Sequence, residues 1–494
     1  MIYTSPTLGA VLLLGVAAQS IAAAPSTAAS TDTAAVPQPT SASAKLDEIV
    51  VTARKKSEVL QDVPLSVAAF DAQELRDRDI HNLDDLSVYV PGLQQGDLAI
   101  TSRLTLRGVN SGDNNAFEQS VGTYVDGIYR GRMNQQHIGL FDVERIEVLK
   151  GPQVALYGNS SLGGAISVIT HKPGFEYGGE VRYAHGLEYD EPQVEAAVDV
   201  PLNDQFTLRL AGIWRDQREG LFPNDATGDS EPSKQDRAAR LSALWLPSDA
   251  LSINLRHEQG EFEREGNIFD VYKHVDGQGN PWPNSYFTGL DDGRLNIGNG
   301  DPFKYQDSFL GNDMAETRVE IEYAFDSLTL TSITGYSEYE YRQSADVDIT
   351  PATLINVYQD EDFSQFSQEF RIAGEWSEQV NYLAGAYLQS DDFRNDYLSD
   401  FNLPELVAPA FGIPASLAAE LIYPFSRHIA LDQDTDQWAI FGNVDFELTD
   451  RLTASLGYRY LMIDKDASQS VRVADIDHQD SLGQLIDLRW LNPE

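Results

Sequence analysis

The sequence predicts a mainly β protein, in which an α+β domain is followed by an antiparallel transmembrane β-barrel. Three observations predict this class. Apolar and polar residues alternate with a period of two after residue 174, as in half-buried strands. Short turns there alternate with much longer connections, as in outer-membrane barrels. Charge is also unevenly divided, because residues 45–173 hold 13 basic and 17 acidic side chains, whereas residues 174–494 hold 22 and 59.

The composition excludes several kinds of site. The 494 residues include no cysteine, which rules out disulfides, thiolate metal sites and cysteine nucleophiles. A net charge of −42 argues against nucleic acid as a partner. The sequence has neither His-Glu-x-x-His nor Gly-x-Ser-x-Gly, and the glycine-rich stretch from Gly158 to Gly164 lacks the lysine of a P-loop. We therefore expect no enzyme activity, no cofactor and no metal.

The N-terminus is typical of an exported protein. Residues 1–24 combine an apolar run with small residues at a cleavage site, which indicates a signal peptide. The first basic residue is Lys45, so the usual basic start of such a peptide is missing and the position of the start codon stays open. Residues 25–46, rich in Ala, Ser, Thr and Pro, are expected to form a flexible linker.

The α+β domain can be followed element by element. A strand is expected around residues 63–67, and Asp71 with Glu74 forms a capping box before a short helix. Asn82 caps a second helix, which Pro91-Gly92 ends. Asp126-Gly127 between apolar pairs is a strong hairpin signal. Further strands are predicted at residues 104–107, 146–149 and 165–170.

About eleven alternating strands are expected from residue 178 onward. Short turns are predicted at residues 203–204, 247–249, 326–327, 376–378 and 449–451, and long connections near residues 218–237, 266–312 and 396–433. Lipid offers backbone groups no hydrogen-bond partner, so strands can cross it only in a closed barrel. The alternative is a soluble multi-sheet protein with one solvated face.

One short segment carries a positive signal for a protein partner. Residues 47–55 are β-prone and lie between the linker and the folded domain, and no local sheet is expected for them. Such a segment is suited to strand addition at another protein's sheet edge. The alternative is that it forms the first strand of the α+β domain.

Taken in order, these motifs resemble the TonB-dependent outer-membrane receptors. The resemblance rests on residues 47–55 as a TonB box, on Leu106-Arg107-Gly108, on Tyr124-Val125-Asp126-Gly127 and on Arg145-Ile146-Glu147-Val148-Leu149-Lys150-Gly151-Pro152. Phe366-Ser367-Gln368-Glu369 and Leu456-Gly457-Tyr458-Arg459-Tyr460 are similar to barrel strands of the family. The resemblance implies a plug domain at residues 56–173 inside a barrel that begins at residue 174. It also implies a place in the bacterial outer membrane and solute import driven by the TonB–ExbB–ExbD complex.

The resemblance also implies roles for individual residues. The segment that would bind TonB consists of Asp47, Glu48, Ile49, Val50, Val51, Thr52 and Ala53. Arg107 and Arg145 would pair with a barrel carboxylate, for which Glu369 is the candidate, and so lock the plug. The alternative is that these arginines are solvated in a wet lumen. Asn159 stands where many relatives carry arginine, which leaves the role of that position open.

Substrate residues are harder to assign. Amides and aromatic rings in the plug loop and the long barrel loops offer a binding surface, with Asn110, Asn114, Asn115, Phe117, Trp282 and Tyr286 as candidates. The family's frequency favours a ferric siderophore. A glycan or cobalamin is the alternative solute, and a passive porin-like channel or a surface enzyme is the alternative class.

The strand count leads to one further expectation. The family's barrels have 22 strands, whereas residues 174–494 supply about eleven, with the start of a twelfth at residues 484–491. We therefore expect about half of a barrel, and a native reading frame that continues for roughly another 250 to 350 residues. An open, curved sheet that covers part of the plug should result.

Overall fold

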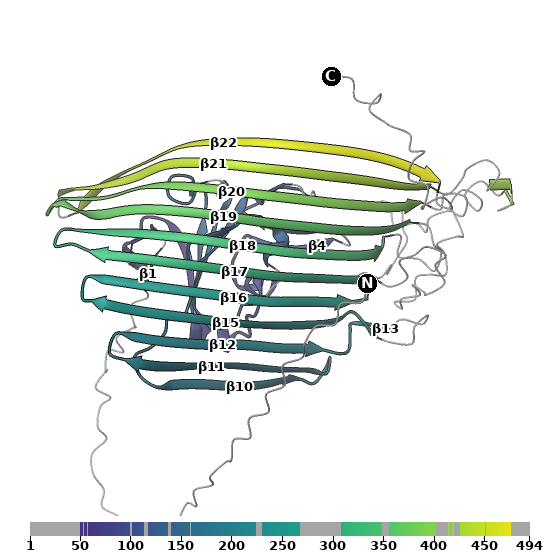
Figure 1. The fold of residues 1–494 in the computed structure, drawn as a ribbon, viewed down its shortest axis with the longest axis horizontal. Coiled ribbons are helices and arrows are strands. Elements are labelled where there is room, and N and C mark those ends of the chain that lie inside the picture. Colours follow the sequence, from purple (N-terminus) through teal and green to yellow (C-terminus); the bar gives the residue numbers. More distant parts are fainter. Residues whose placement is uncertain are drawn as a thin grey trace, which may run out of the picture. The chain divides into compact units, whose positions relative to one another are not determined.

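The computed structural model describes residues 50–475, apart from residues 53, 57, 99–100, 113–116, 137–139, 159, 224–229, 267–307, 348–354, 402–412, 415–416, 419–424 and 450. Two parts can be distinguished, a small α+β domain and one large antiparallel sheet (Figure 1). Among the described residues, no helix is long and apolar enough to cross a membrane.

The small domain, called the plug domain below, extends from β3 to β9. Its main sheet has five strands in the order β3-β8-β9-β6-β7, of which only β6 and β9 run parallel. Its elements are β3 (Ser66–Asp71), α1 (Ala72–Asp77), α2 (Leu83–Tyr89), β4 (Leu93–Leu98), β5 (Thr101–Leu106), β6 (Val121–Val125), β7 (Ile128–Arg130), η2 (Met133–Gln136), β8 (Val143–Lys150) and β9 (Gly164–Thr170). Three short elements precede it, namely β1 (Val50–Val51), β2 (Glu58–Val59) and η1 (Leu60–Asp62).

The predicted helix caps are confirmed. The Asp71 side chain accepts a hydrogen bond from the Glu74 amide at the start of α1. The Asn82 side chain accepts one from the Asp85 amide at the start of α2. Each cap satisfies an amide that the first helical turn leaves without a backbone partner.

The predicted hairpin is also present, whereas one strand is displaced. Asp126 and Gly127 join β6 to β7 with φ of 47° and 87°, as a tight two-residue turn requires. The strand expected at residues 63–67 begins only at Ser66, because a 3-10 turn and then Pro64 precede it. Proline has no amide hydrogen with which to join a ladder.

The large sheet has eleven strands, which agrees with the expected number. They follow one another in chain order, each antiparallel to the next, apart from a small hairpin of β13 and β14 set between β12 and β15. Its strands are β10 (Gly178–Gly186), β11 (Glu191–Asn203), β12 (Phe206–Gln217), β15 (Ser233–Ser248), β16 (Leu251–Glu265), β17 (Phe309–Ala324), β18 (Leu328–Asp346), β19 (Ile355–Ser377), β20 (Val380–Phe401), β21 (Phe425–Thr449) and β22 (Leu452–Asp475), and the hairpin consists of β13 (Phe222–Pro223) and β14 (Ser230–Glu231).

The sheet is consistent with part of a barrel. Within the described part of the chain, β10 pairs only with β11 and β22 only with β21. The short predicted turns all lie at one rim, on the left in Figure 1. The strand predicted at residues 484–491 and most of the long connections fall outside the described residues.

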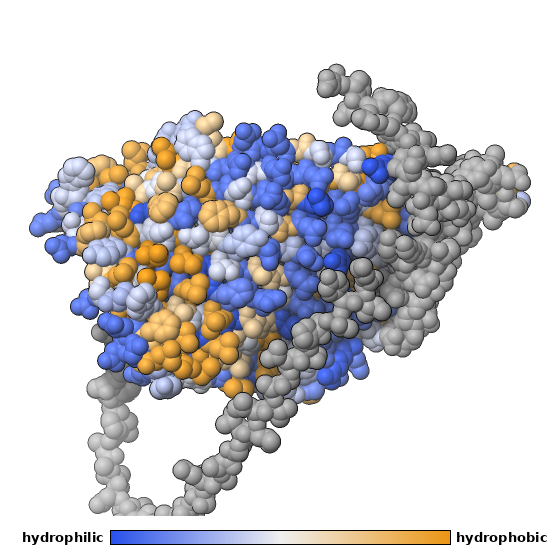
Figure 2. Space-filling view, viewed as in Figure 1, coloured by the Kyte–Doolittle hydropathy of each residue, from blue (hydrophilic) through white to orange (hydrophobic). Residues whose placement is uncertain are grey.

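The two faces of the sheet differ as a membrane barrel requires. Large apolar side chains alternate along the strands and are exposed on the outward face, among them Leu210, Trp245, Ile321, Leu330, Tyr336, Phe366, Phe370, Leu388, Trp438 and Ile440. Figure 2 shows the apolar residues concentrated toward the rim with the short turns, and polar residues toward the opposite rim. This belt suits contact with lipid.

The plug domain packs against the inner face of the sheet. Its own core surrounds Leu86, Leu104, Ile146 and Ile166. A second buried cluster contains plug tyrosines together with Leu383 of β20 and Phe441 of β21. Hydrophobic contact therefore joins the two parts, and charged contacts add to it.

Candidate functional site

The segment before the plug domain, residues 50–58, is called the N-terminal arm below. Val50 and Val51 pair with Val59 and Glu58 in a two-stranded ladder. The expectation that this segment has no local sheet is therefore wrong for these two residues. Val51 is fully buried, whereas Val50 is 46% exposed. Of the residues predicted to bind TonB, Asp47, Glu48, Ile49 and Ala53 lie outside the described residues.

A buried plug carboxylate holds the middle of the arm. Glu147 of β8 accepts hydrogen bonds from the Thr52 amide at 2.7 Å and from the Thr52 hydroxyl at 3.1 Å. The Arg145 Nε donates to the same oxygen at 2.9 Å. Because Glu147 is completely buried, these donors are needed to offset the loss of its hydration.

Three consecutive basic residues of the arm bind the barrel wall. Arg54 and Lys56 both pair with Asp445 of β21, and the Lys56 Nζ lies 2.7 Å from Asp445 Oδ2. Lys55 Nζ lies 2.7 Å from Glu369 Oε2 of β19. The arm is thus attached to two barrel strands as well as to the plug domain.

Lys55 occupies a dry and aromatic environment. Burial lowers its pKa to about 8, although the attraction of Glu369 acts in the opposite direction. Its Nζ lies 4.9 Å from the centre of the Phe441 ring and 5.8 Å from that of Tyr157. A buried ammonium group depends on its counter-charge, so Glu369 is essential to this contact.

The predicted lock between plug arginines and Glu369 is corrected by this geometry. Arg107 lies in a turn with φ of 51°, and its exposed side chain donates to the Ser66 hydroxyl. Arg145 is satisfied inside the plug domain by Glu144 and Glu147. Glu369 does link the barrel to the chain before the plug, but its partner is Lys55.

The main ionic contact of the plug domain involves Arg130 at the end of β7. Its Nε lies 3.0 Å from Glu316 Oε2, and an Nη lies 3.1 Å from Glu258 Oε1. Glu258 and Glu316 stand directly opposite each other on β16 and β17. Like charges in that position repel, and Arg130 bridges them. All three side chains are at most 6% exposed.

The neighbouring charges extend this network. Arg256 of β16 pairs with Glu316, and its Nη1 lies 2.9 Å from Asp126 in the plug hairpin as an ion pair without a hydrogen bond. Burial alone would raise the pKa of Asp126, but the positive charges of Arg256 and Arg318 and the hydrogen bonds from Thr170 hold it below its ordinary value. Glu258, the second carboxylate that Arg130 contacts, accepts a further hydrogen bond from Arg240 of β15 at 2.7 Å.

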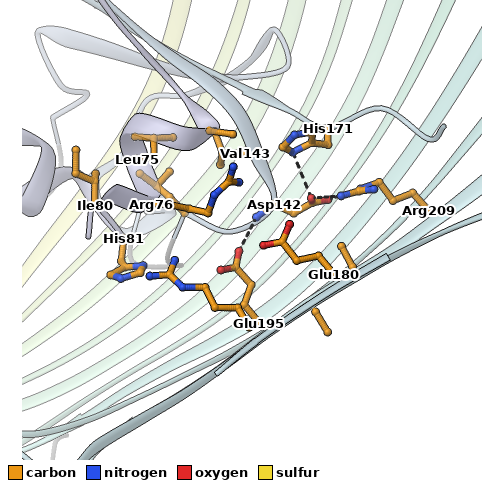
Figure 3. Close-up of a pocket in the computed structure, with 15 residues that line it drawn as sticks. Leu75, Arg76, Ile80, His81, Asp142, Val143, His171, Glu180, Glu195 and Arg209 are labelled. Carbon is orange, nitrogen blue, oxygen red and sulfur yellow. Dashed lines mark hydrogen bonds and ion pairs between the residues drawn. The ribbon is translucent and has the colours of Figure 1, made fainter. Parts of the chain in front are cut away.

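A cavity of about 220 Å³ separates α1 from strands β10–β12 (Figure 3). Asp142 lies at its centre and receives two hydrogen bonds from Arg209, at 2.6 and 2.9 Å. His171 Nδ1 lies 3.3 Å from Asp142 Oδ1, and the Asp142 amide donates to Glu195. The close contact with the Asp142 carboxylate raises the pKa of His171. Burial would raise the pKa of Asp142, but Arg209 and His171 outweigh burial and lower it.

The contact between His171 and Asp142 predicts that the stability of the folded protein depends modestly on pH. The folded pKa of His171 exceeds its ordinary value of 6.5, so its stabilisation is complete below that pH and is lost as pH rises through the folded value. Because His171 is 35% exposed, we expect an effect below about 1 kcal/mol. The wild type should unfold at a higher temperature than His171→Gln at low pH, and this difference should disappear between about pH 6 and 8. A difference that does not change with pH would contradict this assignment.

The predicted substrate residues are placed only in part. Asn110 and Phe117 are exposed on the loop between β5 and β6, and Phe117 is 57% exposed. Asn114, Asn115, Trp282 and Tyr286 lie outside the described residues. In the described ranges, no group of three or more His, Asp or Glu side chains is arranged to hold a metal ion.

Sequence reasoning missed the residues that carry most of the ionic contacts. Glu147, Asp445, Arg130, Glu258 and Glu316 were not singled out. The available signals were the Arg54-Lys55-Lys56 run at the end of the predicted TonB box, and charged residues at the positions of a strand that face the lumen. Their pairing depends on register between distant strands, which a single sequence does not contain.

Comparison with protein families agrees with this architecture. A family model for the TonB-dependent receptor plug domain matches residues 59–165. A second model, for the TonB-dependent receptor-like beta-barrel, matches residues 250–481. The first match covers the plug domain, and the second covers strands from the large sheet.

The chain is also similar to individual receptors and transporters. The ferrioxamine B receptor of Salmonella typhimurium is 28% identical over 271 residues, which cover 50% of this chain and 36% of that receptor. The vitamin B12 transporter of Vibrio vulnificus is 34% identical over 131 residues, or 25% of this chain and 20% of the transporter. The crystal structure of the ferric yersiniabactin uptake receptor of Yersinia pestis is similar in fold, with a TM-score of 0.64 at 18% identity, covering 83% of this chain and 62% of that one. The chain thus spans less than two thirds of the length of each.

Proposed function

Because this chain belongs to the family of TonB-dependent receptors, we propose that it takes part in the TonB-dependent uptake of a ferric siderophore across the bacterial outer membrane. The apolar belt of the sheet would face the lipid of that membrane. The plug domain would close the passage until TonB acts on the N-terminal arm.

The attachment of the N-terminal arm is the observation that carries this proposal. Val50 to Thr52 would pair with TonB as an added strand. The same arm is fixed to the plug through Glu147 and to the barrel through Glu369 and Asp445. These contacts are a few hydrogen bonds and ion pairs, so a pull along the arm can break them one after another without unfolding the barrel.

The solute is proposed from the relatives. One is a ferrioxamine B receptor, and a structure of similar fold is a ferric yersiniabactin receptor. Exposed Asn110 and Phe117 offer an amide and an aromatic ring on the loop between β5 and β6. A corrinoid is the second candidate, favoured by the match to a vitamin B12 transporter.

Growth under iron limitation tests the proposal. A strain lacking the gene should fail to grow on at least one ferric siderophore, with ferrioxamine B as the first probe, and the restored gene should rescue it. Cobalamin-dependent growth serves as the parallel arm. Rescue confined to cobalamin would replace the siderophore with a corrinoid, and wild-type growth of the deletion strain on every siderophore would refute siderophore uptake.

Val50→Pro is expected to abolish uptake while leaving solute binding intact. Proline removes the amide hydrogen that an added strand needs and fixes φ. Uptake of labelled solute and binding to isolated outer membranes measure the two effects separately. We expect uptake to fall at least about tenfold at unchanged surface amounts, which corresponds to about 1.4 kcal/mol of lost interaction with TonB.

Val59→Pro is the matched control. Val59 is the partner of Val50 in the β1–β2 ladder, and its φ of −68° already suits proline. This variant therefore disturbs the same ladder but leaves the proposed TonB-binding strand unchanged. If both variants stop uptake equally, the loss comes from the ladder and not from TonB pairing.

A further inference from the structure

The outward face of β18–β22 changes from apolar to acidic along each strand. The border of the apolar belt is formed by one large exposed side chain of each strand, namely Tyr336, Phe366, Leu388, Trp438 and Met462. Exposed carboxylates follow on the same face, two or four residues closer to the rim with the long connections, namely Glu338, Asp362, Asp392, Asp436 and Asp464. Figure 2 shows this polar half of the sheet. Short turns mark the periplasmic rim of such a sheet, so these carboxylates lie on the side of the outer leaflet.

A groove of about 590 Å³ lies where the belt meets the carboxylates. Four of the apolar side chains at the border of the belt line one part of it, and two carboxylates line another; they are Phe366, Leu388, Trp438 and Met462, and Asp436 and Asp464. The Trp438 ring is supported by the ring of Tyr460, whose centre lies 5.6 Å away. The volume is within the range of about 300–1,000 Å³ that is usual for ligand pockets. Because its apolar part continues the lipid-facing belt, the groove is suited to an acyl chain.

The acidic part of the groove has no cation of its own. Asp436 and Asp464 stand directly opposite each other on β21 and β22, and like charges in that position repel. Within the described part of the chain, neither of them takes part in an ion pair. The crowding continues beyond the groove, because close contact with Asp392 and the charge of Asp466 raise the pKa of Asp434. Cations from outside the chain would therefore stabilise this face.

We propose that this groove docks one lipopolysaccharide molecule of the outer leaflet. An acyl chain lies against Leu388 and Trp438. A divalent cation joins a phosphate of the lipid to Asp436 and Asp464. The inference goes beyond the proposed solute uptake and does not depend on it.

The chemistry of the groove leads to this occupant. Lipopolysaccharide is the lipid of the outer leaflet that combines acyl chains with phosphates, and divalent counter-ions accompany those phosphates. Phosphates and carboxylates repel each other, so they share a site only when a cation lies between them. Mg²⁺ and Ca²⁺ favour such oxygen ligands. Since no group of three or more potential ligands occurs among the described residues, the lipid must complete the coordination.

Binding of fluorescent lipopolysaccharide to the full chain tests the proposal. The protein is extracted from outer membranes in detergent, freed of bound lipid with EDTA, and titrated in Mg²⁺ or in EDTA. We expect binding in Mg²⁺ and an affinity at least about tenfold weaker in EDTA. Combined Asp436→Asn and Asp464→Asn should cause a similar loss in Mg²⁺. Leu388→Ser should weaken binding of the whole lipid but not of its deacylated headgroup.

The matched control removes two other facing carboxylates. Asp360 and Asp396 are directly opposite each other on β19 and β20 but do not line the groove, so combined Asp360→Asn and Asp396→Asn should leave the affinity unchanged. Equal losses in both double variants would reduce the effect to net charge and overturn the proposal. Undiminished binding in EDTA would refute the cation bridge, equally tight binding of the deacylated headgroup would refute the acyl site, and a preference for phosphatidylethanolamine would refute lipopolysaccharide as the occupant.

Thermal unfolding without lipid checks that the groove variant is folded. In EDTA, the protein with Asp436→Asn and Asp464→Asn should unfold at a higher temperature than the wild type, because the repulsion between the facing carboxylates is gone. Mg²⁺ should reduce this difference by stabilising the wild type. A lower unfolding temperature of the variant in EDTA would show that the two carboxylates are satisfied within the protein, and would overturn the proposal.

Discussion

Replacing Arg130 with methionine is expected to unseat the plug domain. Methionine has a similar length but no charge, so Glu258 and Glu316 would face each other across β16 and β17 without the guanidinium that bridges them. Removing one member of a buried ion pair typically costs about 3–5 kcal/mol, because the remaining charge is left without a partner. Arg240 and Arg256 still contact these carboxylates and moderate the loss. We expect the variant to admit bulky antibiotics and to unfold at a lower temperature.

A double substitution distinguishes charge repulsion from simple loss of packing. Glu316→Gln in the Arg130→Met background removes one of the two facing carboxylates and should restore part of the lost stability, with a coupling energy that a double-mutant cycle measures. Arg237→Met is the matched control, since Arg237 is 53% exposed and pairs with Glu261 away from the plug. Normal permeability and unfolding of the Arg130→Met protein would show that the network does not retain the plug.

Local signals in the sequence were sufficient for most of the architecture. The caps at Asp71 and Asn82 and the Asp126-Gly127 hairpin follow from interactions within a few residues, and each is present. Period-two alternation also gave the number of strands, because each strand carries its own pattern. The start of β3 was misplaced because the pattern of Val63 and Leu65 resembles a strand, whereas Pro64 prevents pairing there.

Ionic contacts between distant segments could not be derived in the same way. Arg145 was expected at the barrel wall, yet Glu147 lies two residues along the same strand and so on the same face. The Arg145 guanidinium therefore pairs with Glu147 and not with a barrel carboxylate. Glu369 of the barrel was expected to pair with a plug arginine, but its partner is Lys55, which belongs to a segment that was assigned only to TonB.

Asp445→Asn is expected to release the N-terminal arm from the barrel. Asp445 is the shared counter-charge of Arg54 and Lys56, and it also accepts from Asn443 and Ser455 at 3.0 and 2.6 Å. Asparagine preserves the shape but leaves Arg54 and Lys56 with Glu58, a residue of the arm itself, as their remaining counter-charge, so that no ion pair ties these two cations to the barrel. The Arg54 side chain is only 9% exposed, whereas Lys56 is 35% exposed and keeps part of its hydration. We therefore expect a loss of about 2 kcal/mol, below the range for a fully buried pair.

That loss corresponds to a roughly 30-fold larger population of the open arm. The rate at which a maleimide labels Val51→Cys measures it directly, since the chain has no other cysteine and Val51 is fully buried when the arm is docked. Asp436→Asn is the matched control, because Asp436 lies on the same strand but is exposed on the outward face. Release should also lower the work that TonB must do, so uptake by Asp445→Asn is expected to persist, unlike that of Val50→Pro. If labelling stays at the wild-type rate, Glu147 and Lys55 alone hold the arm, and the barrel contact at Asp445 is dispensable.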